Sequence, residues 1–327
     1  MTTAPDPSVV SSPPAAVGGS RVQWHQVPAV VRTGIEDQLG STVVSAQSQP
    51  GGFSPGSADR VVLADGRRAF VKAVGMEVNP DSPPIHRREL AVTGALPDAG
   101  FSPRLLCGYD DGDWVALAFA DVDGHSPRMP WRVEDLTRCL VALGEMAVRL
   151  SPSPLPDLPR LVEAVAGDFT RWDTLAADVP NDLDRWATER LPELAALGRD
   201  SLEAIDGVAL VHSDVRADNL LLADDRVVVV DWPWASLGAP WVDSLTLVLN
   251  AAVFGEHDPE ALLNRTPVLA AADPDAVTAT VAGLAGYFSW QGRQPARPEM
   301  PTIRRFQLAQ ADACLRWLRV RLDGVPW

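Results

Sequence analysis

The residues best suited to chemistry lie together in one strongly apolar stretch, residues 208–231. It contains the pattern His212-x-Asp214-x-x-x-x-Asn219, and Asp231 follows a second apolar run. In a chain of this composition, chance produces about 0.007 matches to the pattern His-x-Asp-x-x-x-x-Asn. A polar loop capped by Asp and Asn side chains is the structural alternative. It does not explain why apolar strands deliver three polar groups to one edge, so we interpret the stretch as a functional site.

Local sequence predicts a hairpin that brings two of these groups together. Residues 220–222 and 227–230 are expected to form antiparallel strands joined by a short turn. Asn219 would precede the first strand and Asp231 would follow the second, so their Cα atoms should lie about 5 Å apart. With Asp214 on the adjoining loop, these oxygen ligands suit Mg²⁺. Because Mg²⁺ retains waters and substrate phosphates as ligands, a nucleoside triphosphate is also expected.

Composition singles out one further residue. Of the 28 basic residues, 27 are arginine and only Lys72 is lysine. Coding bias explains a general preference for arginine, and the accidental survival of one lysine is the alternative interpretation. A site that needs a compact ammonium group, however, does not accept the larger, forked guanidinium. Lys72 shares an apolar strand face with Phe70 and Val74, where a lone charge is costly to bury and needs a partner.

The pattern of His212, Asp214, Asn219 and Asp231 resembles the catalytic and metal-binding loops of the aminoglycoside phosphotransferase family. The resemblance spans residues 41–325 and is specific in residues 208–243. It implies an α+β, bilobal protein-kinase-like fold with a small β-rich N-terminal lobe and a larger helical C-terminal lobe. It also implies an ATP- and Mg²⁺-dependent O-phosphotransferase that acts on a hydroxyl group of a small molecule.

The resemblance assigns roles to the residues that match the family pattern. Asp214 would be the catalytic base or would orient the acceptor hydroxyl, and His212 would brace its loop. Asn219 and Asp231 would bind Mg²⁺. Asp243 would hydrogen-bond to the catalytic loop and order it.

The nucleotide would be held by residues of the first lobe. Lys72 would contact the α- and β-phosphates and a glutamate, for which Glu89 is the first candidate and Glu77, on an expected loop, the second. Residues 51–57 match the phosphate-covering loop, whose backbone N–H groups face phosphate oxygens; its expected contacts are Gly52, Phe53, Ser54 and Gly56. The hinge would meet adenine through backbone groups of Phe119, Ala120 and Val122. Taken alone, these two segments also fit an ordinary hairpin connection and an edge strand.

Two positions depart from the family pattern. Ser213 stands where the family usually has glycine, and Asp231-Trp232-Pro233 replaces the Asp-Phe-Gly of protein kinases. Pro233 has no backbone N–H and stiffens this segment. We therefore expect neither a phosphorylation-switched activation loop nor a protein substrate.

The sequence gives less information about the acceptor molecule than about the nucleotide site. Residues 151–206 hold twelve acidic residues and five arginines, which favours a cationic acceptor such as an aminoglycoside-like antibiotic or an amino sugar. A solvated acidic face is the alternative for most of these charges. Trp232 and Trp234 would line the acceptor site by stacking or cation–π contact, although such tryptophans are more often core residues. The competing functions are a sugar or amino-alcohol kinase of primary metabolism and a catalytically silent nucleotide-binding scaffold.

The predicted elements divide the chain into three parts. These are a disordered tail over residues 1–20, a nucleotide-binding lobe with the hinge over 21–124, and a helical lobe with the catalytic loop and acceptor site over 125–327. The first lobe is expected to contain strands at 41–49, 59–64, 68–74, 105–109 and 114–119 and helices at 28–39 and 87–96. The second is expected to contain helices at 133–150, 160–177, 183–197, 276–288 and 302–322, with one strand pair around 208–230.

Composition excludes several classes of protein. The 327 residues carry a formal net charge of −15, which argues against nucleic-acid partners because phosphate backbones require a basic face. No apolar run reaches the ~18 residues of a membrane helix, and the first twenty residues lack the pattern of a signal peptide. Three widely spaced cysteines suggest a reducing compartment. We therefore expect a cytoplasmic monomer or homodimer without membrane partners.

Overall fold

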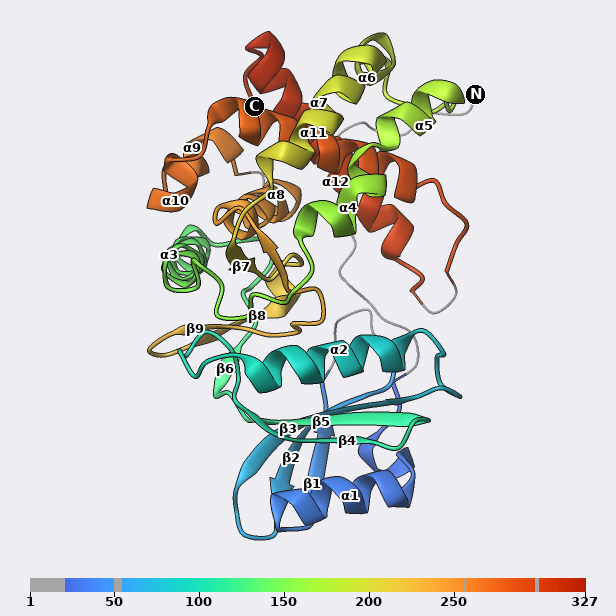
Figure 1. Cartoon of the computed structure of the whole chain (residues 1–327), viewed down its shortest axis with the longest axis vertical. Helices are drawn as coiled ribbons and strands as arrows, with labels where there is room; N and C mark the ends of the chain where they lie inside the picture. The colour runs from blue at the N-terminus through green and yellow to red at the C-terminus, as the bar shows by residue number, and fades with distance from the viewer. Residues whose placement is uncertain (1–20, 50–54, 256, 298–299) are drawn as a thin grey trace, which may run out of the picture.

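The chain forms two lobes in the computed structural model, which describes residues 21–49, 55–255, 257–297 and 300–327 (Figure 1). The smaller lobe is built on a five-stranded sheet, and the larger is mainly helical with two small sheets. This is the bilobal α+β architecture that the sequence predicts. The predicted tail, residues 1–20, lies outside the described residues. No described helix is long and apolar enough to cross a membrane.

The sheet of the small lobe is antiparallel throughout, with the strand order β1-β2-β3-β5-β4. Its strands are β1 (Val43–Ser48), β2 (Ser57–Leu63), β3 (Arg68–Gly75), β4 (Leu105–Asp110) and β5 (Trp114–Ala120). Tight turns join β2 to β3 and β4 to β5. Gly66 and Gly112 in these turns have φ of 86° and 97°, a region that glycine enters without strain.

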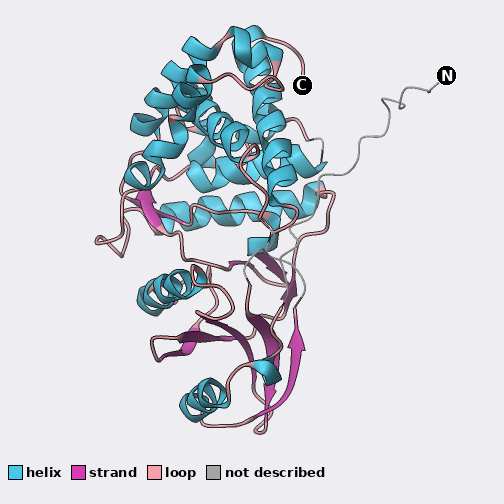
Figure 2. Cartoon of the chain, turned by 90° about the vertical axis from the view of Figure 1, so that its right-hand side faces the viewer, coloured by secondary structure: helices cyan, strands magenta, loops and turns pink. Residues whose placement is uncertain are grey.

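Two helices cover opposite faces of this sheet (Figures 1 and 2). Val31 of α1 (Ala29–Leu39) packs in one cluster with Val71 of β3. Leu90 of α2 (Ser82–Ala95) packs on the other face with Leu117 of β5. Because strand side chains alternate between faces and Lys72 pairs with Leu117, Lys72 lies on the face covered by α2.

Helix α2 begins five residues before the predicted start at Arg87. Pro83 and Pro84 lie in its first turn, ahead of the predicted start. Proline is tolerated in the first turn of a helix because an N–H at that point has no intrahelical acceptor.

The helices of the large lobe differ from the prediction mainly in where they break. They are α3 (Val133–Arg149), α4 (Leu161–Phe169), α5 (Arg171–Ala177), α6 (Arg185–Glu189), α7 (Leu191–Ala204), α8 (Val242–Gly255), α9 (Pro259–Leu263), α10 (Pro267–Ala270), α11 (Pro274–Gln291) and α12 (Ile303–Asp323). The predicted helix over 160–177 is interrupted at Thr170. The one over 183–197 is interrupted at Arg190, because Pro192 begins a new helix, α7. Helix α8 was not predicted, since its nearly continuous apolar sequence has no helical periodicity.

The predicted strand pair around residues 208–230 is part of two small sheets. β8 (Leu220–Ala223) and β9 (Val227–Val229) form the expected hairpin, which β6 (Gly124–His125) extends on the β8 side. β7 (Ala209–Val211) pairs instead with β10 (Ser236–Gly238). Side chains of β7, β8 and β9 belong to the main core of the large lobe, which anchors the loops that connect these strands.

Helix α2 also buries a histidine that the sequence analysis did not single out. His86 is 4% exposed, and its Nδ1 lies 3.2 Å from the carbonyl oxygen of Ser82. Burial and the charge of Lys72 lower the pKa of His86 to about 4; Arg21 acts in the same sense and Asp231 opposes it. His86 is therefore neutral in the folded protein at neutral pH.

We expect the free energy of unfolding to fall as the pH drops from about 6.5 to about 4, because the unfolded chain binds a proton at His86 that the folded chain does not. A shift of this size sets an upper limit of roughly 3 kcal/mol on the loss. Urea unfolding across this pH range should show a smaller loss for His86→Gln than for the wild type. His25→Gln, at an exposed histidine, is the matched control. Equal losses in the wild type and His86→Gln would contradict the prediction.

Candidate active site

Three charged side chains from different elements meet where the two lobes join. The Nζ atom of Lys72 on β3 lies 2.6 Å from Oε2 of Glu89 on α2 and 2.7 Å from Oδ1 of Asp231, which follows β9. The side chains of Lys72 and Glu89 are only 15% and 3% exposed. Glu89, and not Glu77, makes this contact.

The two carboxylates decide the ionisation of Lys72. Burial alone would lower the pKa of Lys72, but the charges of Asp231 and Glu89 outweigh burial and raise it above its ordinary value. Burial raises the pKa of Glu89 in spite of the neighbouring lysine. Burial acts in the same sense on Asp231, but the charge and hydrogen bond of Lys72 lower its pKa overall. A fixed positive charge therefore lies beside an ionised carboxylate.

The catalytic loop leaves β7 in an unusual backbone conformation that Asp243 of α8 supports. Oδ2 of Asp243 accepts a hydrogen bond from the backbone N–H of His212 at 2.7 Å, and Oδ1 accepts one from Ser213 at 2.9 Å. Ser213 has a φ of 69°, in the left-handed region that favours glycine. The serine at this position is therefore in a strained backbone conformation, and the two hydrogen bonds to Asp243 hold it there.

His212 is fully buried behind the loop. Its Nδ1 accepts a hydrogen bond from the backbone N–H of Asp214 at 3.3 Å, which assigns the proton to Nε2. Nε2 then donates to the carbonyl oxygen of Val230 at 3.0 Å, and the ring packs edge-on against Trp232. These contacts connect the catalytic loop to the end of the β8–β9 hairpin. Because the ring is 0% exposed, any contribution of His212 must be positional.

Asp214 is held by two neighbours within the loop. Nδ2 of Asn219, at the end of the 3₁₀ turn η2 (Ala217–Asn219), donates to the backbone carbonyl of Asp214 at 2.8 Å and to Oδ2 at 3.2 Å. Nη1 of Arg216 donates to Oδ1 and Oδ2 at 2.8 and 3.0 Å. Burial raises the pKa of Asp214, whereas the charge of Arg216 opposes that rise. Arg216 is not among the residues predicted from the sequence, although a basic residue between Asp214 and Asn219 is a visible signal.

The hairpin register differs from the prediction by one residue. Leu220 pairs with Val229, and the N–H of Val230 donates to the carbonyl oxygen of Asn219 at 2.9 Å. Asn219 is therefore opposite Val230, not Asp231. The register is set at the turn, where Leu222 pairs with Val227. Asp231 lies beyond the end of β9 and has a φ of 69°, so its backbone has left the extended conformation of the strand.

The donor atoms of Asn219 and Asp231 nevertheless fit a Mg²⁺ ion. The amide nitrogen of Asn219 is used on Asp214, and no described residue donates a hydrogen bond to its amide oxygen. Oδ1 of Asp231 accepts from Lys72, and no described residue donates to Oδ2. Within the described ranges, no group of three or more His, Cys, Asp or Glu residues is arranged to hold a metal. A bound Mg²⁺ would therefore take its other ligands from water and phosphate, as it prefers.

The structure describes only the end of the predicted phosphate-covering loop. Gly52, Phe53 and Ser54 lie outside the described residues. Gly56 has a φ of 106°, and a Cβ atom there would lie 2.5 Å from the carbonyl oxygen of Ala73, so only glycine fits. The N–H of Val22 donates to the carbonyl oxygen of Gly56 at 3.2 Å, which brings the start of the described chain to this loop.

The predicted adenine-binding hinge has one backbone acceptor already in use. The carbonyl oxygen of Val122 accepts hydrogen bonds from the N–H of Gly124 at 2.9 Å and from Nη2 of Arg60 at 2.5 Å. Phe119 is buried in the small lobe, and the N–H of Ala120 donates to the carbonyl oxygen of Arg104. Fewer backbone groups of the hinge are therefore available to hydrogen-bond adenine than the sequence predicts. The N–H of Val122 is one that remains.

The two tryptophans predicted at the acceptor site differ in exposure. Trp232 is 0% exposed and donates from Nε1 to the carbonyl oxygen of Val229 at 2.8 Å. Placing Trp232 in an acceptor site was therefore wrong, because core packing covers its ring. Trp234 is 44% exposed, and the guanidinium of Arg88 lies 5.9 Å from its ring centroid.

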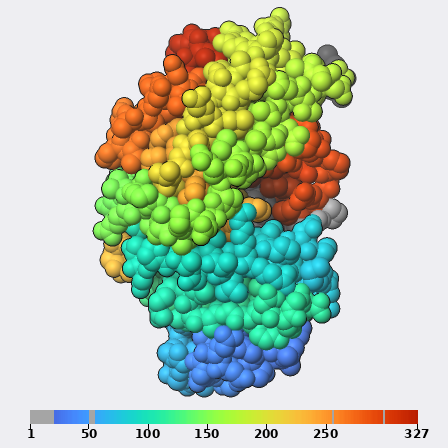
Figure 3. Space-filling model, in the orientation of Figure 1, coloured from blue at the N-terminus to red at the C-terminus, as the bar shows by residue number. Residues whose placement is uncertain are grey.

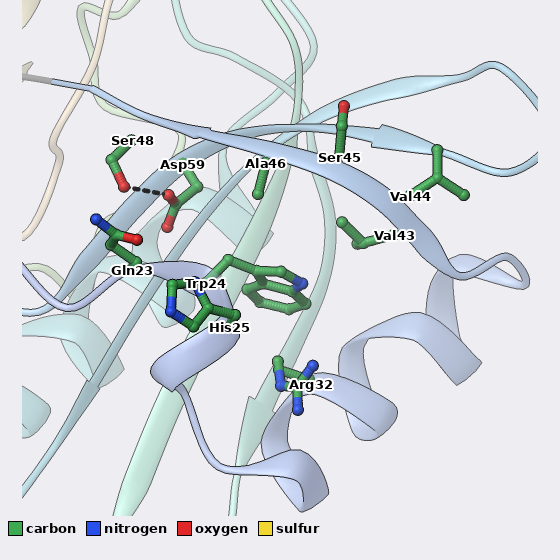
Figure 4. Close-up of a pocket in the computed structure, with 10 residues that line it drawn as sticks. All are labelled: Gln23, Trp24, His25, Arg32, Val43, Val44, Ser45, Ala46, Ser48 and Asp59. Atoms are coloured by element: carbon green, nitrogen blue, oxygen red, sulfur yellow. Dashed lines mark hydrogen bonds between the residues drawn. The ribbon is translucent and has the colours of Figure 1, made fainter.

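The molecular surface is hollowed where the small lobe meets the C-terminal helices (Figure 3). A separate hollow of about 430 Å³ lies on the small lobe, between β1 and the 3₁₀ turn η1 (Trp24–Gln26) (Figure 4). Its lining includes Trp24, His25 and Arg32 but none of the residues of the candidate active site. This second hollow is therefore not part of the candidate active site.

Solved structures with similar folds come from several phosphotransferases. An aminoglycoside phosphotransferase from Alicyclobacillus acidocaldarius subsp. acidocaldarius DSM 446 has a TM-score of 0.56 and 15% identity, over 91% of this chain and 96% of that chain. Spectinomycin phosphotransferase in complex with ADP and spectinomycin has a TM-score of 0.55 and 12% identity, over 86% and 97% of the two chains. Choline kinase LicA from Streptococcus pneumoniae has a TM-score of 0.55 and 14% identity, over 88% and 98%. At these identities, the similarity shows a shared protein-kinase-like fold.

The family is shown by a sequence match. No curated protein sequence matches the chain. The model of the phosphotransferase enzyme family, in contrast, matches residues 52–279. This match covers more than half of the chain and includes Lys72, residues 212–219 and Asp243. The chain therefore belongs to the phosphotransferase enzyme family.

Proposed function

We propose that the protein transfers the γ-phosphoryl group of ATP to a hydroxyl group of a small molecule. The observation that carries the proposal is the ion cluster of Lys72, Glu89 and Asp231 beside the loop that holds Asp214. Lys72 provides positive charge for phosphate oxygens, and Asp214 provides a carboxylate for the acceptor hydroxyl. These are two requirements of phosphoryl transfer. The family membership supports the same reaction class.

Each side chain of the cluster has a distinct part in this proposal. Lys72, oriented by Glu89, would bind oxygen atoms of the α- and β-phosphates. Asn219 and Asp231 would hold Mg²⁺, which when bound neutralises charge on the β- and γ-phosphates. His212 and Asp243 would keep the catalytic loop in its strained backbone conformation.

The transfer step would be an in-line displacement. The acceptor oxygen forms a bond to the γ-phosphorus while the bond from that phosphorus to the bridging oxygen breaks, and ADP leaves with the electron pair. The hydroxyl proton passes to Asp214, whose side chain Asn219 and Arg216 hold in place. Catalysis comes mostly from this positioning and from the fixed charges around the phosphates.

The acceptor is proposed to be an aminoglycoside-like antibiotic or an amino sugar, with a sugar or amino-alcohol kinase of primary metabolism as the second candidate. The structure weakens the charge argument for a cationic acceptor, because seven of the twelve carboxylates in residues 151–206 form ion pairs with arginine. These seven are Asp168, Asp173, Asp182, Asp184, Glu189, Glu193 and Asp206. Transfer of labelled phosphate to a panel of aminoglycosides, amino sugars, amino alcohols and neutral sugars separates these candidates.

Replacing Asp214 by alanine should lower phosphate transfer by about 10³-fold, because the acceptor hydroxyl loses the group that orients and deprotonates it. Nucleotide affinity, measured by calorimetry, should change little, since Asp214 is not among the groups proposed to hold ATP. Asp225→Asn, at an exposed carboxylate on the β8–β9 turn, is the matched control. A wild type that binds ATP but transfers phosphate to no acceptor would favour the silent scaffold instead.

Replacing Lys72 by arginine should lower kcat by at least about 10²-fold although the charge is kept. The planar guanidinium cannot occupy the compact position between Glu89 and Asp231 and also reach the phosphates. The converse exchange Arg226→Lys, at an exposed arginine, tests whether an exchange of the two cations is tolerated elsewhere. Near-normal turnover of Lys72→Arg would remove Lys72 from the mechanism.

A further inference from the structure

Arg216 makes more charged contacts than any other side chain of the catalytic loop. Nη1 bonds to both carboxylate oxygens of Asp214, as described above. On its other side, Nε and Nη2 donate to Oδ1 and Oδ2 of Asp218 at 3.0 and 3.1 Å, a two-bond fork. One guanidinium thus bridges two carboxylates in a row, Asp214–Arg216–Asp218, within a loop of five residues.

The contacts around Asp214 leave little freedom to its side chain. Oδ2 accepts from both Asn219 and Arg216, whereas Oδ1 accepts only from Arg216 among the described residues. Of the two oxygens, Oδ1 therefore keeps the greater capacity to accept a hydrogen bond from an acceptor hydroxyl. Rotation of the carboxylate would break the Arg216 contacts, so the guanidinium fixes the direction in which Oδ1 points.

Charge balance gives Arg216 a second effect on this loop. Asp214 and Asp218 lie next to a site proposed to bind a highly charged triphosphate. The three side chains of the row are each about a quarter exposed or less, so solvent screens them only partly. Arg216 balances part of the negative charge of the two carboxylates, and its two bonds to Asp218 prevent the guanidinium from swinging away.

We propose that Arg216 is a positioning residue for the transfer step: anchored by Asp218, it fixes the carboxylate of Asp214 toward the acceptor hydroxyl. The inference rests on the proposed function, since it assigns Asp214 the role of receiving the hydroxyl proton. A guanidinium is required because its planar fork binds Asp218 through two atoms while the third nitrogen reaches Asp214. A lysine ammonium has the charge but not this geometry.

The test compares kcat and KM of the wild type, Arg216→Ala, Arg216→Lys and Asp218→Asn with ATP and the best acceptor from the panel. We expect kcat of Arg216→Ala to fall by about 100-fold, the effect of misplacing a catalytic group by about 1 Å. KM for ATP should stay within about threefold. Arg216→Lys and Asp218→Asn should show intermediate losses, and added guanidinium chloride at millimolar concentration should restore part of the kcat of Arg216→Ala.

The exposed pair Asp225 and Arg226 on the β8–β9 turn provides the matched controls, Arg226→Ala and Asp225→Asn, which should keep wild-type kcat. The double variant Arg216→Ala/Asp218→Asn should be no slower than Arg216→Ala, because Asp218 acts through Arg216. Wild-type kcat in Arg216→Ala, or a loss confined to KM for ATP, would overturn the inference. If Arg216→Ala does not fold, an unchanged kcat in both Arg216→Lys and Asp218→Asn would overturn it equally. A wild type without transfer activity would instead refute the proposed function itself.

Discussion

The ammonium group of Lys72 is shared by two carboxylates that come from different lobes, and the rest of the site is arranged around that contact. A buried charge is stable only with partners in good geometry, so β3, α2 and the segment after β9 must meet at one point. The five-stranded sheet places Lys72 on the face that α2 covers, and α2 supplies Glu89. The large lobe supplies Asp231 at the end of the β8–β9 hairpin.

Three aspartates of this site have different roles, and the hydrogen-bond partners of each carboxylate determine its role. Both oxygens of Asp243 accept backbone N–H groups, so its carboxylate stabilises the chain where Ser213 adopts a positive φ. The proposed partner of the acceptor, Asp214, is instead held by side chains. Asp231 has one oxygen on Lys72, and no described residue donates a hydrogen bond to the other. The carboxylate that accepts backbone N–H groups holds the loop, whereas Asp214 and Asp231, which accept from side chains, are the candidates for chemistry.

Arginines of the large lobe offset much of its acidic charge by forming ion pairs. Most of the acidic residues between α3 and β7 are paired with arginines, two of which are distant in the sequence. Asp184 pairs with Arg319 of α12, and Asp182 pairs with Arg293, which follows α11. The net charge of −15 therefore overstates the negative field that an acceptor would meet in this region. Paired surface charges contribute little stability individually, but they make charge counting along the sequence a poor guide to acceptor charge.

The sequence by itself determined the two lobes, most strands of the first lobe, the β8–β9 hairpin and the residues that meet at Lys72 and on the catalytic loop. The strands and the hairpin follow from local sequence patterns, and a unique lysine and a rare spacing of His, Asp and Asn indicate the site. The choice of Glu89 as the partner of Lys72 follows from the family resemblance. Only the tertiary structure decided that Asn219 lies opposite Val230, that Trp232 is buried in the core, that prolines begin α2 and α7, and that Arg216 bridges two carboxylates. The physical reason is that side-chain direction and partner choice depend on packing between segments far apart in the chain, which local residue patterns do not encode.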